Sequence, residues 1–160
     1  MNRIIEDIRA LRTVITESIG GLSMEQLNEV PEGFNNNIIW NMGHLIAAQQ
    51  NICYLKPGLP PFLDDLFFQQ YKPGSKPESP ARADRIEEIK ILLLSAADQL
   101  KADYNKGLFT DYPSWINRYG LEMSDIDTVL QFLLFHEGLH FGYIMALKRI
   151  VKKNNQPDRQ

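Results

Sequence analysis

The chain has 160 residues, of which 44% are hydrophobic and 23% charged, a composition typical of one globular domain in water. Its 17 basic and 20 acidic residues give a formal net charge of -3, which excludes the strongly basic surface that direct nucleic-acid binding needs. The single cysteine, Cys53, excludes an internal disulfide and a cysteine-rich metal module and fits a reducing compartment, so we expect a cytoplasmic protein.

We expect neither a signal peptide nor a membrane span. The N-terminal segment interleaves Arg and Glu with its apolar residues, unlike the uninterrupted apolar stretch of a signal peptide. No stretch approaches the ~20 apolar residues that a membrane span requires. The sequence predicts a single domain over residues 1–151 and a solvated tail over residues 152–160.

The first half of the chain predicts two long helices with a short helical turn between them. Apolar residues recur at intervals of three and four from Asn2 to Ile19, and Gly20 follows as a stop. Ser23 and Gln26 have the spacing of a capping box for a short turn. The second long helix is predicted over residues 38–55, after an asparagine run that can cap it.

A long crossover separates these helices from the second pair. Six prolines and two glycines punctuate residues 57–80, around an aromatic insert that contains Phe67, Phe68 and Tyr71. Ser79 followed by Pro80 predicts the start of the third helix. Ser124 opens the fourth, which runs to about Val151, and no segment shows the two-residue alternation of a strand. These features predict an all-α four-helix bundle with a long crossover between the second and third helices.

The three histidines, His44, His136 and His140, are the most informative residues. The last two lie on the apolar stripe of the fourth helix, about 40° and about 6 Å apart, so both imidazoles can reach one ion. His44 would complete a set of three ligands with an open position, which is typical of a catalytic zinc-type site. The alternative is that the rings are buried core histidines, each hydrogen-bonded to a protein group.

Residues 136–140 also match the H-E-x-x-H pattern of zinc peptidases. A peptidase is disfavoured because nothing after His140 supplies the downstream third ligand of that class. Glu137 therefore has two open roles, as a solvated or supporting carboxylate or as a catalytic base.

Small and polar residues share the helical face of His44, which predicts a cavity beside it. The candidates for substrate contact are Trp40, Asn41, Asn51 and Tyr143. Each of them has plain packing or helix solvation as an alternative. Cys53 lies about 180° from His44 around the helix, too far round to join the site.

Two segments resemble the motif regions of the DinB/YfiT-like superfamily, namely NIIWNMGHLIAAQQ at 37–50 and FHEGLHFGYIMALKR at 135–149. The resemblance covers nearly the whole chain in order and length. It implies an up-down-down-up four-helix bundle, often a homodimer, that holds one divalent ion, nickel or zinc in many cases, on three histidines. His44, His136 and His140 match those ligand positions.

The resemblance implies less about the reaction. Some members are similar to transferases or isomerases that use a low-molecular-weight thiol such as bacillithiol or mycothiol. Our first hypothesis is accordingly a metal-dependent transferase or hydrolase acting on a small molecule. The second is a non-catalytic homodimer that the ion braces. Separately, we expect Phe67, Phe68 and Tyr71 in the crossover to be exposed, where they either support dimerisation or form a lid over the pocket.

Overall fold

The computed structural model describes residues 2–154, and Met1 and residues 155–160 lie outside that description. The described chain is an all-α bundle, as predicted, with one very small sheet. Its four long helices are α1 (Asn2–Ser18), α3 (Ile38–Gln49), α5 (Ala83–Asn105) and α6 (Ile126–Asn154). Among these residues no helix is long and apolar enough to cross a membrane.

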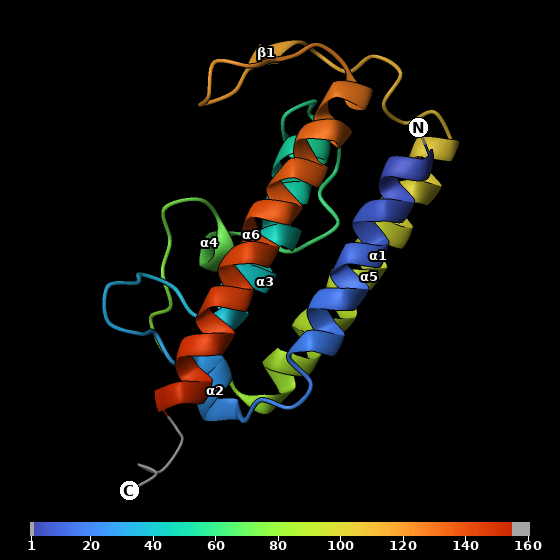
Figure 1. Ribbon diagram of the computed structural model, residues 1–160. Helices are drawn as coiled ribbons and strands as arrows, with labels where there is room; N and C mark the ends of the chain where they lie inside the picture. The colour runs from blue at the N-terminus through green and yellow to red at the C-terminus, as the bar shows by residue number, and fades with distance from the viewer. Residues whose placement is uncertain (1, 155–160) are drawn as a thin grey trace, which may run out of the picture.

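The helix directions give the up-down-down-up order. In Figure 1, α1 and α6 run down the picture, whereas α3 and α5 run up it. Helix α1 packs against α5 and α6, and α3 packs against the same two helices from the opposite side. Helices α3 and α6, which carry the histidines, are therefore direct neighbours.

The helix starts in the first half of the chain follow the predicted capping signals. Helix α2 (Met24–Asn28) begins at Ser23, and both hydrogen bonds of the capping box with Gln26 are present. Asn37 is the asparagine that caps α3, since its Oδ1 accepts from the backbone N–H of Trp40 at 2.7 Å. The predicted helix over residues 38–55 is continuous but changes character, because residues 50–55 form the π-helical turn η1 (Gln50–Leu55). Such wide turns are frequent at functional sites.

The predicted start of the third long helix at Ser79 and Pro80 is wrong, because α5 begins at Ala83. The carboxamide of Asn28 donates to the carbonyl of Ala81 at 2.9 Å and accepts from its N–H at 2.7 Å. These two hydrogen bonds anchor the chain at Ala81 outside the helix. The tertiary contact thus overrides the local Ser-Pro signal.

The start of α6 also differs from the prediction. Asp125, one residue after Ser124, accepts from the N–H of Thr128 at 2.7 Å. The helix continues to Asn154, three residues past the expected domain end at Val151. The rest of the expected tail, residues 155–160, lies outside the described residues.

Two short elements were not predicted. Helix α4 (Asp65–Tyr71) lies in the crossover and is capped by Asp64. Strands β1 (Trp115–Ile116) and β2 (Glu122–Met123) form a small antiparallel hairpin and are too short to show an alternating pattern.

The aromatic residues of the crossover are mostly buried. The side chains of Phe67 and Tyr71 are 1% and 7% exposed, and both belong to the main apolar cluster between the helices. The expectation that they form an exposed surface is wrong for these two residues. Phe68 is partly buried against the same cluster.

The buried face of α6 is displaced from the predicted stripe. Tyr143, expected toward the core, is 45% exposed, whereas Glu137 is completely buried. His136 is buried and His140 partly buried. The histidines consequently lie at the margin of the core, between α3 and the solvent-facing side of the bundle, and not at its centre.

Candidate metal centre

The bundle brings the three histidines together, as predicted. His44 comes from α3, and His136 and His140 come from α6. One ring nitrogen from each residue lies within 4.8 Å of the others, so the group can hold a metal ion. Within residues 2–154 no further His, Cys, Asp or Glu joins this group.

His44 is held by the crossover. Its Nδ1 donates to the backbone carbonyl of Tyr71 at 2.7 Å, which leaves Nε2 as the nitrogen with a free lone pair. The indole of Trp40 stacks on the imidazole, with ring centroids 4.7 Å apart and an interplanar angle of 10°. The Trp40 Nε1–H donates to the hydroxyl of Ser75 at 3.0 Å, so the ring that covers His44 is itself fixed.

Gly43 makes the approach of the crossover possible. A Cβ at this position would lie 2.4 Å from Cδ1 of the Tyr71 ring. The missing side chain therefore lets α4 pack close enough to α3 for the Tyr71 carbonyl to reach His44. A glycine inside an apolar helix was the available sequence signal for this contact.

His140 is held by Asn41. The Nδ2 of Asn41 donates to the carbonyl of Asn37 at 2.7 Å, which identifies Oδ1 as the acceptor that faces the histidine. His140 Nδ1 donates to that oxygen at 2.8 Å. As with His44, this hydrogen bond fixes the ring orientation and leaves Nε2 available, which is the arrangement of histidines that bind metals.

His136 differs because its buried Nδ1 has no hydrogen-bond partner. A buried, unpartnered ring nitrogen is costly unless a ligand satisfies it. Burial lowers the pKa of His136 to about 2 and that of His140 to about 3, and the neighbouring rings and the Arg118 guanidinium add to both shifts. Burial also lowers the pKa of His44. Neutral imidazoles, the form that binds metals, are thus favoured at neutral pH.

A cavity of about 190 Å³ opens beside His44 and His136. Ala48 on α3 and Asn51 and Ile52 on η1 line it, which confirms the expected space beside His44. The hairpin and the end of η1 supply groups that the sequence did not single out, namely Lys56, Trp115, Asn117 and Arg118. No local pattern marked these residues, since only the fold brings the hairpin over the histidines.

The four predicted substrate contacts lie in different places. Asn51 lines the cavity. Trp40 and Asn41 are buried and contact His44 and His140, respectively. Tyr143 packs edge-to-face on Phe34 with centroids 5.5 Å apart and does not line this cavity.

Glu137 belongs to a polar cluster that is buried in the core and inaccessible to solvent. Its Oε1 accepts from Arg12 Nε at 3.0 Å and from Nη2 at 2.5 Å. Arg12 also donates to Gln49 Oε1 at 2.8 Å and to the carbonyls of Leu93 and Leu45. The expectation of a solvated Glu137 is therefore wrong, because the carboxylate is completely buried against a guanidinium.

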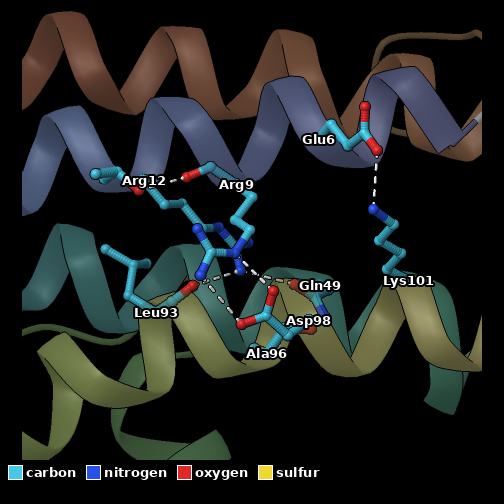
Figure 2. Close-up of polar contacts among 9 residues, drawn as sticks. Glu6, Arg9, Arg12, Gln49, Leu93, Ala96, Asp98 and Lys101 are labelled. Atoms are coloured by element: carbon cyan, nitrogen blue, oxygen red, sulfur yellow. Dashed lines mark hydrogen bonds and ion pairs between the residues drawn. The ribbon is translucent and has the colours of Figure 1, made fainter.

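Figure 2 shows Arg12 extending from α1 toward Gln49 on α3 and Leu93 on α5. Two ion pairs join α1 to α5 in the same view, Arg9 with Asp98 and Glu6 with Lys101. Arg12 thus joins all four long helices. The sequence did not predict its burial, because a charged residue within the first apolar stripe carries no local sign that it is buried.

Cys53 is buried within the second apolar cluster, formed mainly by α1, η1 and the first half of α6. Burial raises the pKa of its thiol to about 12, so the thiol stays protonated. It does not belong to the three-histidine group.

These features define the class of the protein as a helical bundle whose three-histidine cluster can hold a metal ion. The model of the DinB superfamily matches residues 7–144, which is most of the chain, so the chain belongs to the DinB superfamily. No curated protein matches it significantly.

Proposed function

We propose that this protein is a metal-dependent enzyme that acts on a small molecule, as a transferase using a low-molecular-weight thiol or as a hydrolase. His44, His136 and His140 would hold one divalent transition-metal ion, with nickel or zinc as the first candidates. The observation that carries the proposal is the unpartnered Nδ1 of buried His136. It belongs to a cluster in which one ring nitrogen from each histidine lies within 4.8 Å of the others, and a cavity opens beside that cluster.

The donor set suits this chemistry. Three imidazoles without a fourth protein ligand among the described residues leave a coordination position for substrate or water. A divalent ion on them would lower the pKa of a thiol or a water molecule and so supply a nucleophile at neutral pH. The protein's own thiol, Cys53, is not needed for this role and is buried elsewhere.

The other residues of the site have supporting roles in this proposal. Asn41 and the Tyr71 carbonyl orient two of the rings, and Trp40 covers His44. Asn51 is the predicted substrate contact that lines the cavity. We assign Glu137 to the support of α6 and not to proton transfer, because its Oε1 is bound by Arg12 and the whole side chain is buried.

A non-catalytic metal-braced homodimer is the second candidate. Phe135, Leu139 and Tyr143 follow one another at four-residue intervals on α6 and are 58%, 46% and 45% exposed. An apolar stripe of this kind is favourable for self-association. The homodimer and the cytoplasmic location stay predictions, and sedimentation analysis of the full chain tests the first of them.

The experiment that separates the two candidates is a turnover screen. Zinc-loaded and nickel-loaded protein is assayed for thiol transfer to electrophiles and for hydrolysis of small esters and amides. Turnover that disappears in metal-treated His136→Gln supports the enzyme. Metal uptake that raises the Tm without turnover in either assay supports the braced dimer.

A further inference from the structure

Two hollows in the described part of the chain differ in charge. The larger one, about 820 Å³, lies between the crossover and the start of α5, and acidic and basic side chains alternate around it. The smaller one, about 190 Å³, lies beside the histidines and is lined by two cations, Lys56 and Arg118, and by no carboxylate from the described residues. Only the smaller cavity therefore favours one sign of ligand charge.

Asn117 adds a donor that no protein group uses. Its Oδ1 accepts from the backbone N–H of Tyr119 at 2.9 Å and from that of Leu121 at 3.1 Å, which closes the hairpin turn. These two bonds fix the orientation of the carboxamide and identify Nδ2 as the remaining group. Asn117 is 8% exposed, and its buried Nδ2 has no partner. A buried donor of this kind is expected to meet an acceptor.

The two cations are free of acidic partners as well. Arg118 lies over the ring of Tyr119 at 4.9 Å and donates to its hydroxyl at 2.8 Å. Lys56 lies over the indole of Trp115 at 4.7 Å. Within residues 2–154 neither cation forms an ion pair with a carboxylate. The positive charge of Arg118 also contributes to the lowered pKa of all three histidines.

We propose that this cavity binds the carboxylate of a small acidic substrate, with Arg118 and Asn117 Nδ2 donating to the carboxylate oxygens. The planar guanidinium and the amide N–H supply separate donors for the two oxygens, and Lys56 adds positive charge at the cavity wall. The carboxylate lies at the hairpin side, and the rest of the molecule points toward His44 and His136. The inference deepens the proposed function and rests on it for the assignment of the histidines as the reacting end.

The size of the cavity limits the ligand. Pockets for drug-sized molecules typically occupy about 300–1,000 Å³, so a cavity of about 190 Å³ takes a smaller molecule or one end of a longer one. Propionate is a suitable probe, and propionamide has nearly the same shape without the charge.

The test is an NMR titration of the full chain with propionate, propionamide and inorganic phosphate, which follows the Trp115 indole and the Asn117 side-chain amide. Arg118→Gln removes the guanidinium. Asn117→Asp keeps an oxygen for the Tyr119 and Leu121 N–H groups but replaces the free donor with a carboxylate oxygen, which repels an anion at this position. Arg149→Gln is the matched control, because Arg149 is exposed on α6 and does not line the cavity.

We expect propionate to shift both signals and propionamide to shift neither. Each cavity variant should weaken propionate binding about tenfold or more, the usual effect of losing a charge-assisted hydrogen bond, and Arg149→Gln should not. Equal binding of propionate and propionamide, or unchanged binding in both variants, would overturn the inference. Phosphate that binds more tightly than propionate would overturn the assignment to a carboxylate.

Zinc content is measured on the same samples, so that the two proposals fail separately. A protein that binds no zinc but still binds propionate through Arg118 contradicts the proposed function and retains the anion site. A protein that binds zinc but shows no preference for propionate retains the metal site and loses this inference.

Discussion

Two polar clusters share α3 and α6, one in the core of the bundle and one at the margin of the core. The first consists of Arg12, Gln49 and Glu137, where all five N–H donors of the guanidinium have protein acceptors. The second consists of the three histidines, where two rings are anchored through Nδ1 and the Nδ1 of His136 has no partner. The carboxylate of Glu137 accepts through Oε1, whereas its buried Oε2 has no partner. The two clusters therefore differ in their donors: every guanidinium N–H is used, but His136 makes no hydrogen bond through Nδ1.

This difference in hydrogen bonding indicates a structural role for the arginine cluster and a ligand-binding role for the histidine cluster. The arginine cluster uses its hydrogen bonds to join helices, and Gln49 completes it by donating to the carbonyl of Ala96 at 2.8 Å. The histidine cluster has hydrogen bonds that orient two of its rings, whereas the buried Nδ1 of the third ring, His136, has none. A buried group with unused hydrogen-bonding capacity beside a cavity is a better pointer to a ligand than burial alone.

The largest expected effect is on the arginine cluster. Arg12→Met leaves the Glu137 carboxylate buried without a cation, which typically costs about 3–5 kcal/mol. The free energy of unfolding, measured by urea denaturation, should fall by that amount, or the variant should fail to fold. Arg9→Met removes only the exposed pair with Asp98 and should cost less than about 1 kcal/mol. Similar losses in the two variants would contradict a structural role for Arg12.

The histidine cluster should make the metal-free protein sensitive to acid. The pKa values of His136 and His140, about 2 and about 3, lie below the 6.5 of a free histidine, so the unfolded chain binds more protons than the folded one between these values. The free energy of unfolding that the two neutral rings contribute is fully present above about pH 6.5. It is lost as the pH falls toward 3, by up to about 1.4 kcal/mol per pH unit for each ring.

The matched variant for this prediction is His136→Gln combined with His140→Gln, which removes both titrating rings. Its unfolding free energy, measured in chelator between pH 7 and pH 5, should depend less on pH than that of the wild type. Identical pH profiles would show that the rings are not desolvated.

A smaller effect is expected from Gly43→Ala. The new Cβ displaces the Tyr71 ring and with it the carbonyl that orients His44. We expect a loss of about 1–3 kcal/mol in the free energy of unfolding and a metal affinity lower by about 10- to 100-fold. Equilibrium dialysis with zinc measures the affinity.

Gly142→Ala is the control for that change, since nothing lies within 4 Å of the added Cβ on α6. It should leave metal affinity unchanged and stabilise the helix by up to about 1 kcal/mol. An equal fall in affinity for both variants would contradict the role of the Tyr71 carbonyl.

Much of the fold was predictable because its signals are local. Helix spacing, the Ser23 capping box and the Asn37 cap are each specified within a few residues, and all three are confirmed. The grouping of the histidines was predictable because four-residue spacing on one helix fixes two of them side by side. The start of α5 was not predictable, since it depends on Asn28, more than fifty residues away.

The surroundings of the site depend on similarly distant contacts. Tyr71 and the hairpin residues reach the histidines only through the crossover and the turn before α6. The burial of Arg12 could not be predicted either. An arginine is usually solvated unless a buried partner pairs with it, and the partner of Arg12 is Glu137, on a distant helix. These contacts join segments that carry no common sequence pattern.

The central claim is that the three histidines hold one metal ion. Its most direct test is elemental analysis of tag-free protein equilibrated with zinc or nickel, for the wild type and for His44→Ala, His136→Ala and His140→Ala, each shown to be folded by circular dichroism. The account predicts close to one ion per wild-type chain and its loss in each folded variant. Wild-type protein that stays metal-free after reloading, or variants that retain the ion, would contradict it.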